Sequence, residues 1–158
     1  ARDHLGVTTI VWLPNGHHMD TGPAATDGHI DGVAQFVAPG RVLLEVPADP
    51  ASPGNRGGLE NLERLRSARD GRGRVMEVSL LDPGIDAAVS YANHYLANDA
   101  VVVPTAGAGS DSEALDVLRS VYPEREVIAV PGLTLAFGGG GPHCITQQIP
   151  EGDAAPAV

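Results

Sequence analysis

Apolar and polar positions follow an order along the chain that occurs twice. In the first copy, residues 33–37 and 41–46 flank the turn Ala38-Pro39-Gly40 and predict a β-hairpin. A loop rich in Pro, Gly and Asn leads to residues 59–69, which predict a helix, and residues 74–81 predict another strand. Three leucines share one face of that helix: Leu59, Leu62 and Leu65. The first copy is therefore strand, strand, helix, strand.

The second copy follows about 60 residues later in the same order. Residues 91–97 and 100–105 flank Asn98-Asp99 and predict a second hairpin. Residues 110–122 predict a helix, and residues 126–130 predict the strand that ends this copy. The apolar side chains of the predicted helix share one face: Ala114, Leu115, Leu118 and Val121. Two copies of one ββαβ unit indicate an α+β fold built from repeated modules.

Three segments lie outside these two modules. Residues 7–13 predict a strand before the first hairpin, and residues 143–148 predict a strand that begins a third unit. Residues 151–158 are small and are expected to form a disordered tail. An open array of modules leaves edge strands exposed, so we expect the complete protein to close into a ring or to cover these edges.

Composition narrows the class of partner. The chain has 158 residues, enough for one domain, and a formal net charge of -10 with no basic patch, which argues against nucleic acid and anionic membranes as partners. No apolar run approaches the roughly 18 residues needed to span a bilayer, and no signal peptide is expected at the start. The single cysteine excludes an internal disulfide and favours a reduced, cytoplasmic protein. A small cationic ligand suits this acidic chain best.

The first candidate for chemistry is the segment TDGHID at residues 26–31. On an extended segment His29 and Asp31 project from the same side, which places an imidazole beside a carboxylate. Such a pair suits proton transfer and cation binding. The alternative is a surface loop in which the histidine has no function.

The second candidate is the segment GGGGPHC at residues 138–144, where Cys144 follows a glycine run. Glycines adopt positive φ and let a ligand or another segment approach the backbone closely. The alternative is a structural thiol. A phosphate-binding loop is excluded because no G-K-[ST] follows the glycines.

The neighbouring pair His17-His18, close to Asp20 in the sequence, could suggest a metal site. Adjacent histidines point apart on a strand, and the cysteine and histidine spacing of structural zinc sites is absent. We therefore expect no metal at these residues.

Although Cys144 lies far from His29 and Asp31 in the sequence, a nucleophile and its base meet in space. His29 precedes the first hairpin, and Cys144 occupies the corresponding place in the third unit. Equivalent edges of repeated modules face a shared centre in a ring. The repeat thus suggests one site made of thiol, imidazole and carboxylate, as a hypothesis from spacing.

Four phrases resemble the C-terminal half of agmatine deiminases, in the Porphyromonas-type peptidylarginine deiminase family of the pentein superfamily. They are TIVWLPNG (9–16), TDGHIDGVAQFVAPGRVLL (26–44), SYANHYLANDAVVVPT (90–105) and GGGGPHCITQQIP (138–150). The resemblance implies a pentein-type α/β propeller, of which this chain holds two ββαβ modules plus fragments. Residues 1–150 would then be the C-terminal part of the catalytic domain.

The resemblance also implies roles for particular residues. Cys144 would be the nucleophile, His29 the general acid and base, and Asp31 a carboxylate that pairs with the substrate guanidinium. Further contacts with the substrate would come from Asp27, Gly139 and Gly140.

The reaction implied is hydrolysis of agmatine to N-carbamoylputrescine and ammonia through a covalent thiouronium, with no cofactor. The expected partners are a small cationic guanidino substrate and the missing N-terminal half of the propeller, and a homodimer is left open. Deimination of arginine or peptidylarginine is the alternative activity. A truncated, inactive pentein that binds a guanidinium ligand is the alternative from another class. Gly141 and Pro142 stand where the family usually has Asn-Ile, which bears on substrate specificity.

Overall fold

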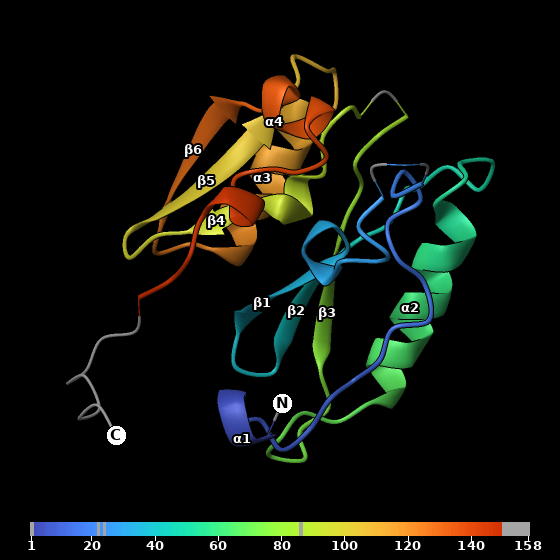
Figure 1. The fold of residues 1–158 in the computed structure, drawn as a ribbon, viewed down its shortest axis with the longest axis vertical. Helices are drawn as coiled ribbons and strands as arrows, with labels where there is room; N and C mark the ends of the chain where they lie inside the picture. Colours follow the sequence, from blue (N-terminus) through green and yellow to red (C-terminus); the bar gives the residue numbers. More distant parts are fainter. Residues whose placement is uncertain (1, 22, 24, 86, 150–158) are drawn as a thin grey trace.

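The computed structural model describes residues 2–21, 23, 25–85 and 87–149. Its framework is a pair of three-stranded sheets, each with one long helix, and Figure 1 shows the two units side by side. Each unit has the strand order of the sequence, so the chain builds one sheet completely before it starts the next. The fold is therefore of the α+β class, as the repeat predicts.

The first module contains β1 (Ala34–Ala38), β2 (Arg41–Glu45), α2 (Asn55–Ser67) and β3 (Glu77–Leu81). β1 and β2 form an antiparallel hairpin, and β3 pairs in parallel with β2 after the chain has crossed through α2. Parallel neighbours need such a crossover, and a helix is its usual form. The module has the predicted ββαβ order.

The second module contains β4 (Tyr95–Leu96), β5 (Ala100–Thr105), α3 (Asp111–Val121) and β6 (Glu126–Pro131). β4 pairs antiparallel with β5, and β6 pairs in parallel with β5 over the whole length of both strands. The pairing pattern is that of the first module. The predicted repeat is confirmed.

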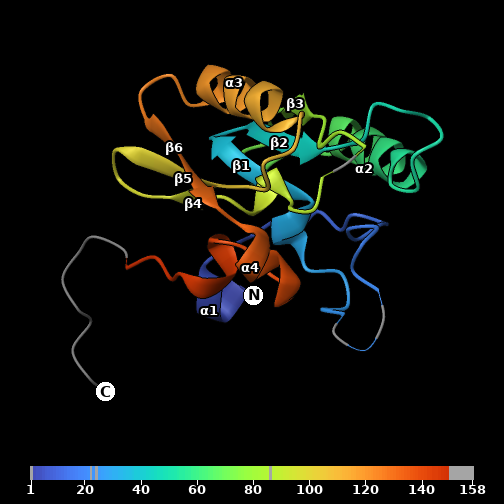
Figure 2. The ribbon, with the colours of Figure 1, turned by 90° about the horizontal axis from the view of Figure 1, so that it is seen from above.

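Short elements lie near the ends of the modules. Three 3-10 turns, η1 (Ile30–Gly32), η2 (Tyr91–Asn93) and η3 (His143–Ile145), accompany two small helices, α1 (Arg2–Leu5) and α4 (Leu133–Phe137). η1 and η2 precede the hairpins of their modules at equivalent positions. Figure 2 shows α2 and α3 on one side of the molecule and α4 on the other.

The two hydrophobic cores meet between the modules. One core packs Leu62 and Leu65 of α2 against the first sheet. The other surrounds Leu118 of α3 and includes Leu43 and Leu81 from the strands of the first module. Because α3 packs against both β3 and β6, the modules share buried apolar surface and form one unit.

The expected strand at residues 7–13 is wrong. This segment has no strand partner and runs beside α2 in Figure 1. Side chains of α2 hold the segment: the Asn61 amide donates to the Asn15 carbonyl and accepts from the Asn15 N–H, and Arg64 Nε donates to the Trp12 carbonyl. Val11 and Leu13 pack against the core of the first module, and an apolar pattern of this kind does not distinguish such packing from a strand.

The expected strand at residues 143–148 is also wrong, because Cys144 lies in the 3-10 turn η3. The predicted strand at 91–97 is confined to Tyr95–Leu96, since η2 occupies residues 91–93. The helix expected at 59–69 begins earlier, at Asn55, and Leu59 is half exposed. Its buried stripe runs through Gly58, Asn61, Leu62 and Leu65. The tail expected at 151–158 lies outside the described residues.

Within the described residues, no helix combines the length and apolar character required to cross a membrane.

Candidate active site

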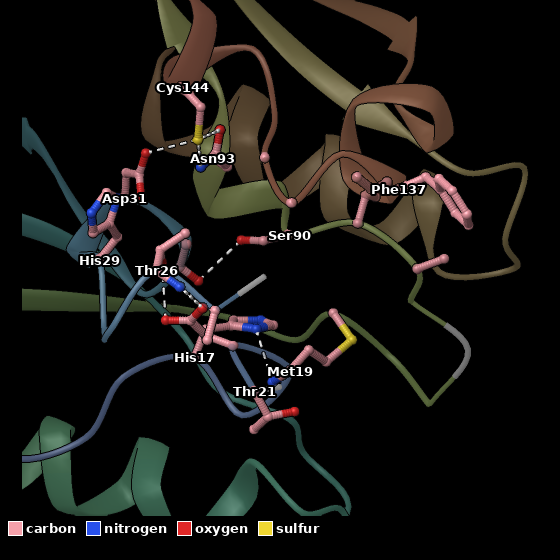
Figure 3. Close-up of a pocket in the computed structure, with 18 residues that line it drawn as sticks. His17, Met19, Thr21, Thr26, His29, Asp31, Ser90, Asn93, Phe137 and Cys144 are labelled. Carbon is pink, nitrogen blue, oxygen red and sulfur yellow. Dashed lines mark hydrogen bonds between the residues drawn. The ribbon is translucent and has the colours of Figure 1, made fainter. Parts of the chain in front are cut away.

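The three 3-10 turns meet on one side of the molecule. η1 and η2 pack against each other, and each carries one polar side chain, Asp31 or Asn93, that reaches η3. Figure 3 shows both side chains directed at Cys144. A 3-10 turn places side chains differently from a strand, so Asp31 does not project from the extended segment that the sequence suggested.

The thiol of Cys144 contacts both turns. Sγ donates a hydrogen bond to Asp31 Oδ2 over 3.1 Å and accepts one from Asn93 Nδ2 over 3.1 Å. The cysteine is nevertheless exposed. An exposed thiol is accessible to a substrate, whereas a structural cysteine is buried and inert.

The carboxylate of Asp31 is central to this arrangement. Its Oδ2 also accepts a hydrogen bond from Nδ1 of His143 over 2.9 Å, and its side chain is only 14% exposed. Burial on its own would raise the pKa of Asp31, but the hydrogen bonds from Cys144 and His143 outweigh it and hold that pKa below its ordinary value. Asp31 is thus a partly buried carboxylate that is held in its anionic form.

The glycine run allows the backbone to reach this wall. Gly139 has a φ of 85°, a conformation that other residues adopt only with strain. Gly141 is buried against Asn93, and a Cβ at this position would lie 2.6 Å from Asn93 Oδ1. The glycine run predicts that a ligand or another segment approaches the backbone closely. The structure shows such an approach by the segment that carries Asn93.

A cavity of about 280 Å³ opens in front of the thiol. Its lining comes from the loop before η1, from η1 and η2 and from the glycine run, and it includes these polar and glycine residues: His17, Asp20, His29, Asp31, Ser90, Asn93, Gly139, Gly140 and Cys144. A cavity of this size with converging polar groups suits a small polar ligand. Two carboxylates, from Asp20 and Asp31, favour a cation.

The predicted site residues do not all meet in this cavity. His29, Asp31, Cys144, Gly139 and Gly140 line it together, but no hydrogen bond to the His29 ring is found in the described part of the chain. Asp31 pairs with His143 instead of His29.

Asp27 lies elsewhere. It lines a neighbouring hollow of about 590 Å³ together with His18 and residues of α2, and its φ is 59°. The structure therefore separates Asp27 from Cys144.

His17, His18 and Asp20 make other contacts in the structure. His17 and His18 do not point apart as they would on a strand, because their ring centroids are 4.7 Å apart. Asp20 accepts hydrogen bonds from the N–H and hydroxyl of Thr26 and from the N–H of Gly28. These backbone amides lower the pKa of Asp20. Across the described residues, no group of three or more metal-binding side chains is placed to hold an ion.

Two residues of the site were not predicted from the sequence. Asn93 and His143 both lie in phrases that carried the family resemblance, but no spacing rule connects either of them with Asp31. A signal for Asn93 was present, because it occupies the position in the second module that η1 occupies in the first. Asparagine lacks a titratable group, which is why a search for acids, bases and nucleophiles passes over it.

The arrangement can bind and attack a planar cation. Asp31 offers a carboxylate to paired N–H donors, and Cys144 places sulfur beside the same oxygen. His29 lines the cavity and can exchange protons with a bound molecule.

Comparisons with known proteins agree on one family. The sequence model described as Porphyromonas-type peptidyl-arginine deiminase matches residues 1–150. The chain is 42% identical over 155 residues to a putative agmatine deiminase of Streptomyces coelicolor, which covers 93% of this chain and 46% of that protein. It is 37% identical over 174 residues to the agmatine deiminase of Stutzerimonas stutzeri, and the match covers 94% of this chain and 46% of that protein.

Solved structures give the same result. The agmatine deiminase of Enterococcus faecalis superimposes with a TM-score of 0.83 at 30% identity, over 95% of this chain and 47% of that one. A putative arginine deiminase from Porphyromonas gingivalis gives a TM-score of 0.84 at 29% identity, over 95% of this chain and 45% of that one. The chain thus spans about half the length of the curated relatives it matches, and its two modules form part of a larger propeller.

Proposed function

Because this chain belongs to the Porphyromonas-type peptidyl-arginine deiminase family, we propose that it supplies the nucleophile and part of the substrate site of an agmatine deiminase. The observation that carries the proposal is the contact of the Cys144 thiol with the partly buried carboxylate of Asp31, in the wall of a cavity that His29 also lines. The names of several relatives support agmatine as the substrate.

In this proposal the guanidinium pairs with Asp31 and so neutralises the carboxylate beside the thiol. A thiolate at Cys144 is then no longer opposed by a neighbouring negative charge. Sulfur passes its proton to His29 and attacks the guanidinium carbon, so that a C–S bond forms and the electron pair of the C=N bond moves to nitrogen. His29 protonates the departing amino group, and the C–N bond breaks to release ammonia and leave a thiouronium on Cys144.

Water completes the reaction. His29, now the base, takes a proton from a water molecule that attacks the thiouronium carbon. Collapse of this adduct breaks the C–S bond, returns the electron pair to sulfur and releases N-carbamoylputrescine, a ureido compound of polyamine metabolism. We assign the proton transfers to His29 because it lines the cavity, whereas His143 is held by Asp31.

We also propose that the other half of the propeller completes the site. Large apolar side chains are exposed on strands of both sheets: Phe36 on β1, Leu80 on β3 and Ile128 on β6. Exposed apolar strands favour association with further modules. The added half would supply the remaining contacts to the guanidinium and the amine end of the substrate. A reduced thiol nucleophile supports a cytoplasmic location as part of this proposal.

Turnover of agmatine tests the proposal. The full-length protein should release ammonia and a ureido product, and Cys144→Ser should lower this rate at least about a thousandfold, since the hydroxyl is a far weaker nucleophile. Asp31→Asn should also abolish most of the activity, because the amide cannot neutralise a guanidinium. The matched control is Asp116→Asn on the exposed face of α3, which should keep the wild-type rate.

Three results separate the alternatives. Turnover of arginine or a peptidylarginine in preference to agmatine would keep the reaction and change the substrate. Binding of agmatine without ammonia release would favour an inactive guanidinium-binding protein. Full activity of Cys144→Ser would contradict the mechanism.

A further inference from the structure

A buried carboxylate outside the cavity links the turns that carry Asp31 and Asn93. Glu45 is the last residue of β2, and its side chain is only 2% exposed. Isolated burial of a carboxylate is costly unless hydrogen bonds compensate it. The partners of Glu45 therefore indicate why a charged residue follows the apolar positions of this strand.

Those partners come from two distant segments. Oε2 of Glu45 accepts hydrogen bonds from the backbone N–H of Ala92 over 2.9 Å and from the hydroxyl of Ser90, 3.1 Å away. Oε1 lies 3.3 Å from Nε2 of His17. The Met19 N–H donates to Nδ1 of that ring, so Nε2 carries the hydrogen and donates to Glu45.

The link to η2 is direct. Ala92 lies in the middle of this turn, between Tyr91 and Asn93, and its buried N–H has Glu45 as acceptor. The next residue along the turn, Asn93, donates to the thiol of Cys144. A shift of Ala92 relative to β2 would therefore move the amide that holds the thiol.

The link to η1 has two components. The hydroxyl of Ser90 lies 3.0 Å from the carbonyl of Gly32, the last residue of η1, and can turn between this carbonyl and Glu45. The backbone N–H of Glu45 donates to the carbonyl of Val33, directly after η1. Figure 3 shows the Ser90 side chain between the labelled side chains of Asn93 and His17.

We propose that Glu45 is a positioning residue that sets the distance between Asp31 and Asn93 and thereby the environment of the Cys144 thiol. Glu45 does not touch the thiol, and it does not line the cavity in front of it. Only the catalytic consequence of this role rests on the proposed function of Cys144. The geometric effect on the thiol does not require turnover.

The chain offers a direct readout, because Cys144 is its single cysteine. In Glu45→Gln one oxygen becomes an NH₂ group, which cannot accept from the Ala92 N–H or from His17, so one contact is lost at nearly constant volume. The thiol should then be released from the Asp31 carboxylate. We expect its alkylation by iodoacetamide to change about three- to tenfold, the equivalent of one hydrogen bond.

The rate is measured on the full 158-residue chain from about pH 6 to about pH 10, because the thiolate is the reacting species. A changed pH dependence distinguishes repositioning of Asp31 from simple unfolding. Greater access of the reagent to the thiol would not explain a changed rate, since Cys144 is already exposed in the wild type. The matched control is Glu77→Gln at the start of β3, in the same sheet, which should leave the alkylation profile unchanged.

Ser90→Ala gives an independent test that keeps the carboxylate. It should change the alkylation rate in the same direction, and the double variant with Glu45→Gln should change it less than the product of the single effects, because both act through one network. If Glu45→Gln does not fold, Ser90→Ala decides. Folded variants that all alkylate with the wild-type profile would overturn the proposal.

These outcomes are independent of the enzyme assay. An altered alkylation profile in a protein that turns over no guanidino compound would refute the proposed function and leave the role of Glu45 intact. An active enzyme whose alkylation profile is insensitive to both substitutions would support the proposed function and refute the role of Glu45.

Discussion

At the scale of single residues, the site depends on how closely Gly141 approaches Asn93. The side chain of Asn93 is buried, fills the space where a Cβ of residue 141 would lie and donates to the Cys144 thiol. Pro142 follows directly and is buried as well, so the backbone has little freedom to retreat. A glycine is therefore required at position 141.

Gly141→Ala should displace the Asn93 amide from the thiol. We expect a loss of about 1–3 kcal/mol in the free energy of unfolding from overpacking, together with an altered rate of Cys144 alkylation. Urea denaturation and the alkylation assay measure the two effects. Gly109→Ala is the control, since a Cβ there has no heavy atom within 4 Å. Equal behaviour of the two variants would show that the contact with Asn93 is not tight.

At the scale of elements, the two long helices present different buried faces to equivalent sheets. α3 buries Ala114, Leu118 and Val121, with Leu118 fully inaccessible, in a core that both modules share. α2 buries a glycine and an asparagine, Gly58 and Asn61, beside Leu62 and Leu65, and leaves Leu59 half exposed. The helix of the second module is thus the more important for joining the modules.

Leu118→Ala should lower the free energy of unfolding by about 2–5 kcal/mol, because a cavity opens in a core that cannot collapse. Leu59→Ala is the same substitution on α2 and should cost less than about 1 kcal/mol, since half of that side chain already lies in water. Chemical denaturation of both variants measures the difference. Similar losses would place Leu59 in a core that the structure does not show.

At the scale of the whole molecule, a buried histidine joins the modules next to the site. His94 donates from Nδ1 to the carbonyl of Tyr91, so Nε2 of the neutral ring accepts from the hydroxyl of Tyr122 at the end of α3. Gln35 of β1 donates to the His94 carbonyl. Burial lowers the pKa of His94 to about 4. The neutral ring therefore joins η2 to the end of α3 within the second module, and the His94 carbonyl joins that module to β1.

This shift predicts how stability depends on pH. In the unfolded chain a histidine titrates near its ordinary value of about 6.5, so below that pH the unfolded state binds the proton that the folded state excludes. Stability should thus be constant above about pH 6.5 and fall as the pH approaches 4, by up to about 3 kcal/mol from this group.

Denaturation of wild type and His94→Gln between about pH 7 and about pH 5 measures this contribution. The variant should be less stable than the wild type at the higher pH, and its free energy of unfolding should fall less on acidification. His4→Gln, at an exposed position on α1, should keep the wild-type slope. An unchanged slope in His94→Gln would contradict the assignment.

The repeated module was predictable because its signals are local. Apolar spacing and turn residues identified both hairpins, both helices and the closing strands, and β5 has the predicted limits, 100–105. The strands expected at 7–13 and 143–148 failed because a β-like composition needs a neighbouring strand to pair with. The first of these segments runs along α2 instead, and the second forms a turn beside Asn93.

For the site, the sequence by itself determined which residue types are present. The lone Cys144, the His29 and Asp31 pair and the glycine run all line one cavity. Only the tertiary structure decided their contacts: Asp31 with Cys144 and His143, Asn93 against Gly141, and Glu45 beneath the turns. The reason is physical, since nucleophiles and turns are recognised from local chemistry, whereas hydrogen-bond partners depend on how separate modules pack.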